Sequence, residues 1–265
     1  MSERDADSPL DAHGVALVRA ANPSPFTLEG TNTWIVGRDP AWVIDPGPGL
    51  ADHVEAVLAA AAARGGIGGI AVTHGHPDHV EAVEELRSRA GGPPVAGFGD
   101  RWDVRLGDGD PFGPLRALAS PGHAPDHLAF VAGRVAFTGD AVLGRGSVFV
   151  APGTGALRGY LDALRRLRAL DLALLCPGHG PVVTEAAAKL DEYLAHRLDR
   201  ERRLLEALDD GLRGTEELLE RVWSDAPSTL RRAAAITLAA HLDKLDEEGR
   251  LPAGVERPRV EVPTV

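Results

Sequence analysis

The segment from Ile70 to His79 constrains this chain more than any other part of its sequence. It begins with apolar and β-branched residues, which predict a strand, and it runs directly into the pattern His-x-His-x-Asp-His. Pro77 suits the first turn of a helix, so the last two residues of the pattern are expected at a helix start. A strand end and a helix start therefore direct four side chains towards one small volume: His74, His76, Asp78 and His79.

Neutral imidazole and carboxylate groups at these spacings suit Zn²⁺ and related first-row metal ions. The alternative is a solvated polar turn, but the coincidence of these residue types at these offsets favours a metal site. Three further candidates each follow an apolar run and a Gly turn. They are His123 in Ser-Pro-Gly-His, Asp140 in Phe-Thr-Gly-Asp and His179 in Cys-Pro-Gly-His. One such residue alone is usually only solvent-facing, whereas three in the same arrangement provide ligands for a second metal ion.

On these residues the chain resembles the metallo-β-lactamase superfamily, in the branch that includes glyoxalase II and ribonuclease Z. The matching motifs extend from about Thr31 to His179. The resemblance implies an α+β fold, an αββα sandwich with a dinuclear site on its edge. Carried over by position, it implies two groups of metal ligands bridged by Asp140: His74, His76 and His123 for one ion, and Asp78, His79 and His179 for the other. The implied cofactors are two divalent metal ions, zinc in the first place, with manganese or iron as alternatives.

A narrower group is indicated by Gly-Thr-Asn-Thr-Trp-Ile-Val-Gly from residue 30, by Val-Ile-Asp-Pro-Gly from residue 43 and by a helical C-terminal part. These features resemble the β-lactamase-like protein 2 group, whose winged-helix-type extension follows the hydrolase domain. Members of that group are linked to cleavage of single-stranded RNA, and relatives to thioester hydrolysis. The resemblance implies that Asn32 lines the substrate cleft and that Asp45 supports the metal shell. A turn residue and a helix cap are the respective alternatives.

The implied reaction is hydrolysis of an ester, thioester or phosphodiester by a dinuclear, metal-dependent enzyme. Two metal ions about 3.5–4 Å apart lower the pKa of a shared water, so that a bridging hydroxide attacks the carbonyl carbon or the phosphorus. Asp78, which ligates a metal and orients this hydroxide, is the candidate catalytic residue. The alternatives are a single-stranded RNA endonuclease of the β-lactamase-like protein 2 type and, less favoured, a nucleic-acid-binding regulator. Antibiotic cleavage is disfavoured, because antibiotic-cleaving relatives often have Cys where Asp140 stands.

The chain is expected to divide into a hydrolase domain over residues 1–195 and a small helical, winged-helix-like domain over 196–265. Short apolar runs between turn residues predict strands over 33–36, 42–44, 70–73, 94–96, 115–118, 128–131, 135–137, 148–150 and 172–175. Apolar periodicity predicts helices over 51–63, 77–90 and 157–170.

Three more helices are expected towards the C-terminus. The first follows Thr184 as its cap and ends before Gly211, the second spans 215–223, and the third runs from 227 to 248. A wing or tail is expected over 251–263. The third helix is expected to bury five apolar residues: Leu230, Ile236, Leu238, Leu242 and Leu245.

Composition limits the partners of the chain. Its 265 residues include 28 Lys and Arg against 39 Asp and Glu, a net charge of −11, which argues against a protein that coats duplex nucleic acid. One cysteine can form no internal disulfide, no secretory signal is recognisable, and the apolar runs are far shorter than the ~20 residues of a membrane span. We therefore expect a cytoplasmic protein that acts on a small ester or thioester or on single-stranded RNA, with no membrane or duplex DNA partner. The oligomeric state is left open.

The remaining histidines, the cysteine and a set of arginines have simpler interpretations. His127 is expected to support the site rather than to bind metal, and Cys176 to be a small buried apolar residue. Four histidines are expected to be unrelated to the site: His13, His53, His196 and His241. Seven arginines form either a surface that follows phosphates or ordinary solvated helix faces: Arg165, Arg166, Arg168, Arg197, Arg200, Arg202 and Arg203.

Overall fold

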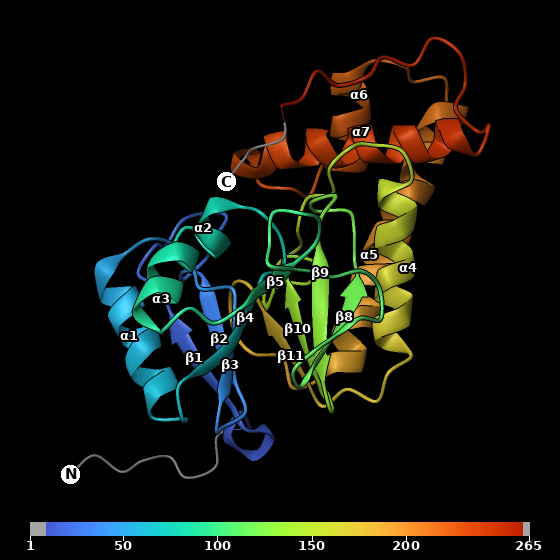
Figure 1. Ribbon diagram of the computed structural model, residues 1–265. Helices are drawn as coiled ribbons and strands as arrows, with labels where there is room; N and C mark the ends of the chain where they lie inside the picture. The colour runs from blue at the N-terminus through green and yellow to red at the C-terminus, as the bar shows by residue number, and fades with distance from the viewer. Residues whose placement is uncertain (1–8, 262–265) are drawn as a thin grey trace.

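Two β-sheets packed face to face, with helices on both outer sides, dominate the computed structural model (Figure 1), which describes residues 9–261. The first sheet has the order β1-β2-β3-β4-β5-β6 and the second β11-β10-β9-β8-β7. The strands of the first sheet are β1 (Val15–Arg19), β2 (Asn32–Val36), β3 (Ala41–Ile44), β4 (Ile67–Ala71), β5 (Val95–Gly97) and β6 (Val104–Arg105). Those of the second are β7 (Pro111–Phe112), β8 (Leu115–Ala119), β9 (Leu128–Ala132), β10 (Val135–Gly139) and β11 (Leu174–Pro177).

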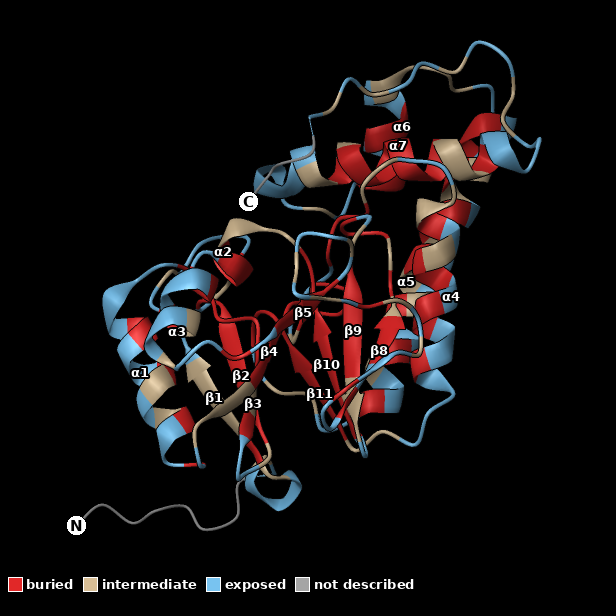
Figure 2. Ribbon diagram, viewed as in Figure 1, coloured by how far each residue is buried: buried red, intermediate tan, exposed pale blue. Residues whose placement is uncertain are grey.

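Helices cover the outer face of each sheet. α1 (Ala51–Ala62) and α3 (Val83–Arg89) lie over the first sheet, where apolar side chains of α1, α3 and the central strands form one core cluster. α4 (Ala156–Arg168) and the first half of α5 (Ala186–Asp209) cover the second sheet in the same way. A third cluster fills the space between the sheets, and its Trp34 and Phe137 rings lie 6.1 Å apart. Figure 2 shows buried strands beneath helices whose outward faces are exposed, which confirms the expected αββα sandwich.

The parallel strand pairs determine where the polar loops meet. β3 and β4 are parallel, with Ile44 opposite Ala71, and β10 and β11 are parallel, with Ala136 opposite Leu175. Parallel strands end at the same edge, so the loops after β3 and β4 lie together, as do those after β10 and β11. The short helix α2 (Pro77–Val80) begins in the loop after β4. All the predicted metal ligands therefore come from one end of the sandwich.

The C-terminal part is helical. It contains the second half of α5, α6 (Thr215–Val222), the 3₁₀ turn η2 (Ser228–Leu230) and α7 (Arg231–Glu247), which share a core of their own. α5 is continuous from Tyr193, in the core of the second sheet, to Leu204, in the C-terminal core. The domain boundary expected between residues 195 and 196 thus falls inside a helix, and it stays a prediction.

The helix predicted over 77–90 is wrong as a single element, because it divides into α2 and α3. The amide of Ala82 donates to the carbonyl of Gly47 (3.1 Å), outside the helix, and this interrupts the helical pattern of backbone hydrogen bonds. The strand predicted over 148–150 is also wrong. Val150 donates its amide to the Thr237 hydroxyl of α7 (3.3 Å), so these buried residues pack against the C-terminal part and do not join a sheet. The edge strand β1 and the short β6 and β7 were not expected.

Two predictions about the C-terminal part need correction, and the alternative of a wing or a tail is decided for the described residues. α5 is capped at Glu185, without a side-chain hydrogen bond, and Thr184 is not its cap. Leu230 is 36% exposed, because it lies in η2 ahead of the helix, whereas the other four predicted residues of α7 are buried. No strand forms a wing over 250–261, and residues 262–265 lie outside the described part. The short 3₁₀ turn η1 (Asp11–His13) precedes β1, and no helix within 9–261 is long and apolar enough to span a bilayer.

Candidate metal centre

The structure brings all seven predicted ligands together at the loop end of the sandwich. In the first group, Nε2 of His74 lies 2.9 Å from Nδ1 of His76, which lies 3.0 Å from Nε2 of His123. The three nitrogen atoms are within 4.8 Å of one another. They come from the loop after β4 and the loop after β8 and converge on one point, which is the arrangement of a three-histidine metal site.

The second group consists of Asp78, His79 and His179, again with one possible ligand atom each within 4.8 Å of the others. Oδ2 of Asp78 is 3.3 Å from Nε2 of His179 and 3.5 Å from Nε2 of His79. α2 therefore presents its first-turn carboxylate and imidazole to a histidine that follows β11, more than 95 residues later in the chain.

Asp140 lies between the two groups. Its Oδ2 is 3.6 Å from Nε2 of His123 and 3.3 Å from Nε2 of His179, and its Oδ1 is 3.7 Å from Nε2 of His79. One carboxylate thus contacts a member of the first group and two members of the second. This is the position that a ligand shared by two metal ions must occupy.

Two buried atoms provide an independent test of whether these residues fit metal ions. Nε2 of His79 and Oδ1 of Asp140 have no hydrogen-bond partner within the described residues, although both side chains are buried. Buried polar atoms without partners are costly and rare in folded proteins unless an ion or water satisfies them. Both atoms belong to the cluster, and both are of types that first-row metal ions bind. The donor set therefore fits divalent metal ions.

Asp45 holds His79 in the orientation that a ligand needs. Its Oδ2 accepts a hydrogen bond from Nδ1 of His79 (2.9 Å), which leaves Nε2 directed into the cluster. The same carboxylate accepts hydrogen bonds from the backbone amide and the hydroxyl of Thr73, both at 2.8 Å. A carboxylate behind a metal-binding histidine fixes its tautomer and raises its basicity. Asp45 thus has the supporting position that the resemblance implied.

Three further contacts support the cluster, and sequence reasoning missed two of them. The hydroxyl of Thr31 donates to Oδ2 of Asp78 (3.0 Å), and Oδ2 of Asp126 accepts a hydrogen bond from the backbone amide in the His-Gly-His turn (3.0 Å). His127 was expected to support the site. Its Nε2 accepts the backbone amide of Asp140 (3.0 Å), and its Nδ1 contacts the Ser120 hydroxyl (2.8 Å). The sequence signals for Thr31 and Asp126 were their positions, the first within the motif from residue 30 and the second three residues after His123.

Gly178 explains the Pro-Gly-His turn. A Cβ atom at this position would lie 2.5 Å from Oδ1 of Asp140 and 2.8 Å from Cε1 of His79. Both distances are far shorter than van der Waals contact, so no other residue fits without moving a candidate ligand. The glycine is therefore required by the close approach of the backbone to the cluster.

Burial and neighbouring charges set the protonation of the cluster. Burial, together with His79 and His127, holds the pKa of His74 well below 6.5, and burial lowers the pKa of His123 to about 4. Both rings are therefore neutral at pH 7, the form that binds metal. Burial alone would lower the pKa of His79 too, but the carboxylates of Asp78, Asp45 and Asp140 outweigh it and raise that pKa to about 10. Three carboxylates around one imidazole create the negative field that attracts a cation.

Asn32 does not line a cleft, which corrects the role implied for it. The residue has no exposed surface, and its Nδ2 donates to the carbonyls of Pro177 (3.0 Å) and Gly180 (2.9 Å). Its Oδ1 accepts a hydrogen bond from Arg19 (2.9 Å). The side chain thus joins β2 to the loop that carries His179, and it acts beneath the cluster instead of facing a substrate.

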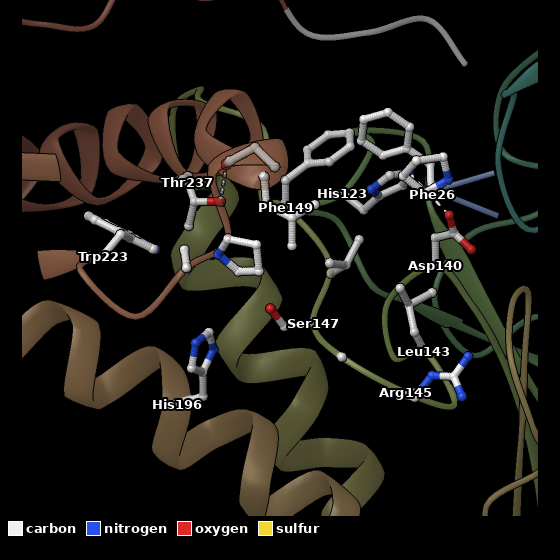
Figure 3. A pocket seen from close by; sticks show the side chains of 18 of the residues that line it. Phe26, His123, Asp140, Leu143, Arg145, Ser147, Phe149, His196, Trp223 and Thr237 are labelled. Carbon is white, nitrogen blue, oxygen red and sulfur yellow. Dashed lines mark hydrogen bonds and ion pairs between the residues drawn. The ribbon is translucent and has the colours of Figure 1, made fainter. Parts of the chain in front are cut away.

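A cavity of about 320 Å³ lies beside the cluster and extends to the C-terminal helices. His123, Asp140 and His179 line it on one side, and residues of α5, of α7 and of the segment between α6 and α7 line it on the other. Figure 3 shows His123 and Asp140 together near Phe26, with Trp223 and His196 on the opposite side. The volume is at the lower end of the range of small-molecule pockets, about 300–1,000 Å³.

The other histidines and the cysteine lie outside the cluster. His53 is buried against the Thr33 hydroxyl and the Pro46 carbonyl (both 3.0 Å), and His241 is buried in the C-terminal core. His13 is exposed, and His196 lines the cavity. Cys176 is buried within β11, where burial raises the pKa of its thiol, as expected for a side chain without a chemical role.

The seven arginines do not form a continuous phosphate-binding surface. Five pair with carboxylates on the helix surfaces, and two are buried at the cavity wall. The surface pairs are Arg165–Asp162, Arg166–Asp108, Arg168–Asp191, Arg202–Glu206 and Arg203–Asp199. Of the two alternatives stated above, solvated helix faces therefore describe these five residues.

Comparison with known proteins agrees with this geometry. The family model described as metallo-beta-lactamase superfamily matches residues 26–97 and 93–179, and the model for the beta-lactamase associated winged helix domain matches residues 215–252. The chain is similar to a beta-lactamase-like protein 2 homolog of Caenorhabditis elegans, at 30% identity over 89% of this chain and 85% of that protein. It is also similar to an atrochrysone carboxyl ACP thioesterase of Aspergillus chevalieri, at 34% identity over 83% of this chain and 76% of that protein.

Solved structures show the same fold. A metallo-beta-lactamase family protein from Thermus thermophilus aligns with a TM-score of 0.66 at 26% identity, and the alignment covers 89% of this chain and 94% of that one. The matched sequence region contains all seven clustered residues, and the second match covers α6 and α7. The chain therefore belongs to the metallo-beta-lactamase superfamily, as a metal-dependent hydrolase with a C-terminal winged helix domain.

Proposed function

We propose that this protein is a dinuclear hydrolase of ester or thioester bonds. In this proposal one ion binds the first ligand group and the other binds the second, and Asp140 joins them: His74, His76 and His123, then Asp78, His79 and His179. The position of Asp140 between both groups is the observation that carries the proposal. Zinc suits this mixed nitrogen and carboxylate set, and manganese and iron are the alternatives for the same ligands.

Bound by these residues, two divalent ions would supply Lewis-acid chemistry: they would lower the pKa of a water molecule and offset the negative charge that develops on substrate oxygen. The protein's own part is to position groups around this water. Asp78 is the proposed proton-handling residue, because its carboxylate faces the cluster and Thr31 holds Oδ2 in place. In the reaction the water oxygen bonds to the carbonyl carbon and the C–O or C–S bond breaks. The products are a carboxylate, a proton and an alcohol or thiol.

Two observations favour carbonyl substrates over nucleic acid. A relative is named as a thioesterase, and the surface arginines that would follow a phosphate backbone are paired with carboxylates. The basic residues of α7 are paired as well: Arg231 with Glu216, Arg232 with Glu261, and Lys244 with Glu201 and Glu248. A helix that reads DNA presents free basic and polar side chains to the groove. We therefore place single-stranded RNA cleavage second and a regulator of duplex DNA last.

Metal analysis and a paired substrate assay test the proposal. The purified full chain is expected to contain about two divalent ions per molecule and to hydrolyse N-acetylcysteamine thioesters faster than single-stranded RNA. His76→Ala is expected to abolish hydrolysis and to reduce metal content, whereas His13→Ala, an exposed control in η1, leaves both unchanged. Hydrolysis that survives strong chelation, or that His76→Ala retains in full, refutes the proposal. Faster turnover of RNA than of thioesters makes the endonuclease the correct function.

A further inference from the structure

The cavity beside the cluster is built jointly by the two parts of the chain. From the sandwich come His123, Asp140 and Phe149, and the Phe149 ring lies 4.6 Å from the His123 ring. From the C-terminal part come Trp223, at the end of α6, and Ala233, in the first turn of α7. Figure 3 shows Phe149 between His123 and the C-terminal helices. A ligand with its reacting bond at the metal centre therefore has space to extend towards α7.

The side chains that face this space are mostly apolar. Phe26, Leu143 and Leu230 line it together with the two aromatic residues Phe149 and Trp223. Phe26 and Leu230 are also among the few large apolar residues with considerable exposure, at 43% and 36%. Apolar surface that is exposed along the wall of a cavity favours an apolar ligand, because binding removes that surface from water.

Most hydrogen-bonding groups of the same wall already have partners, although the buried Nε of Arg197 has none among the described residues. Arg197, which is buried, donates to the carbonyl of Val148, and Arg200 donates to the Val222 carbonyl and to both oxygens of Asp225 at 2.7 and 2.8 Å. The Thr237 hydroxyl donates to the carbonyl of Ala233 (3.0 Å) and accepts the amide of Val150. Arg145 pairs with Glu29, and its side chain is 65% exposed. A phosphodiester in this cavity would have to break such pairs, whereas an apolar group leaves them intact.

We infer that this cavity is the acyl pocket of the enzyme and that the residues lining it from α7 and from the segment between α6 and α7 select the acyl group. The substrate class is an ester or thioester with an apolar acyl group of several carbons, whose carbonyl lies at the cluster and whose chain lies against Phe149, Leu230 and Trp223. This inference rests on the proposed function for the position of the carbonyl. It gives the winged helix domain a role in substrate selection instead of nucleic-acid binding.

Ala233 is the position at which selection can be changed with the least effect on the fold. It lines the cavity, it is only partly buried, and it does not belong to the C-terminal core cluster. A phenyl group in its place occupies cavity volume that the acyl chain needs. The matched control is Ala187→Phe, because Ala187 is exposed on α5 and does not line the cavity.

The test compares N-acetylcysteamine thioesters of acetic, hexanoic, octanoic and dodecanoic acid with the metal-loaded full chain. We expect kcat/KM to rise about fourfold for each added methylene until the pocket is full. Ala233→Phe is expected to lower kcat/KM for the octanoyl thioester about tenfold or more and to leave the acetyl thioester within about twofold. The control variant is expected to keep the wild-type profile. Thermal unfolding and metal content establish that each variant is folded and loaded.

Calorimetric binding of octanoate and acetate, the carboxylate products, tests the pocket without catalysis. Octanoate is expected to bind more tightly than acetate, and Ala233→Phe is expected to remove the difference. If kcat/KM does not change with chain length, or if Ala233→Phe and Ala187→Phe lower it equally, the acyl pocket is refuted. Metal-dependent hydrolysis in the same assay would still uphold the proposed function. Tight octanoate binding without hydrolysis of any thioester has the opposite meaning: the apolar pocket stands and the proposed function fails.

Discussion

Asp45→Asn tests whether the carboxylate behind His79 is necessary for metal binding. The buried Asp45 carboxylate accepts three hydrogen bonds, two from Thr73 at 2.8 Å and one from Nδ1 of His79 at 2.9 Å. An amide has one acceptor oxygen, so its NH₂ group must face one of these donors. If it faces His79, Nδ1 must become the acceptor, and the one proton of the neutral, metal-binding form of the ring moves to Nε2, the atom that points into the cluster.

The magnitude follows from this exchange. Loss of an outer partner of a ligating histidine costs about 10–100-fold in metal affinity, or about 1.4–2.7 kcal/mol. A mismatched buried donor also lowers the free energy of unfolding of the metal-depleted protein by about 1–3 kcal/mol. Metal titration followed by calorimetry, and urea unfolding in the presence of chelator, measure the two effects separately.

The control is Asp171→Asn, because Asp171 is 86% exposed and pairs with Arg134 at the surface. We expect it to change neither quantity by more than about 0.5 kcal/mol. Wild-type affinity for both ions in Asp45→Asn, with a normal unfolding transition, refutes the argument that this hydrogen bond fixes the tautomer of His79.

Three more substitutions probe the cluster and the C-terminal core. Gly178→Ala places a Cβ 2.5 Å from Oδ1 of Asp140, and we expect a loss of about 1–3 kcal/mol in unfolding free energy together with reduced metal content, measured by urea unfolding and metal analysis. Thr31→Val removes the hydroxyl that holds Asp78, and we expect kcat to fall about tenfold while two ions remain bound, measured by steady-state kinetics and metal analysis. Burial lowers the pKa of His241 from 6.5 to about 3, so the stability that its neutral form contributes is complete above pH 6.5 and is lost as the pH falls towards 3. At pH 5 the loss in unfolding free energy amounts to about 2 kcal/mol. We expect His241→Leu to remove this part of the pH dependence, measured by urea unfolding.

Each of these expectations has an outcome that contradicts it. Full metal content in Gly178→Ala means that the turn adapts without moving Asp140. Loss of both ions in Thr31→Val means that the hydroxyl supports binding instead of positioning Asp78. Identical pH dependence of unfolding in wild type and His241→Leu, between pH 7.5 and 5, means that His241 is protonated without cost in the fold.

Local sequence was sufficient to find the cluster because most of its information is local. His74, His76, Asp78 and His79 lie within a span of six residues, and a strand end followed by a helix start holds them together whatever the rest of the chain does. The remaining candidates were identified by a shared pattern, an apolar run followed by a Gly turn. That pattern has a physical basis at Gly178, where the backbone passes too close to the cluster for a side chain.

Asn32 shows where local reasoning failed. The motif around it was recognisable, but its amide bonds to the carbonyls of Pro177 and Gly180, at least 145 residues away, and these contacts bury it completely. The strand predicted over 148–150 failed for the same reason, since its partner is Thr237 on α7. From sequence alone, a short run of β-branched and aromatic residues predicts a strand. Only the tertiary structure shows that its partner is a helix and not a neighbouring strand.

The sequence by itself therefore predicted the candidate ligand types, their spacing at strand ends and the helical C-terminal part, and the resemblance that its motifs carry implied the αββα class. The resemblance implied a bridging Asp140 and a supporting Asp45, and only the tertiary structure showed which atoms they contact: Nε2 of His179 for Asp140 and Nδ1 of His79 for Asp45. Only the tertiary structure showed that α7 and the segment between α6 and α7 wall an apolar cavity beside the cluster. The physical reason is range. Motif spacing records contacts made along the chain, whereas a shared ligand and a pocket wall depend on packing between segments separated by dozens of residues or more.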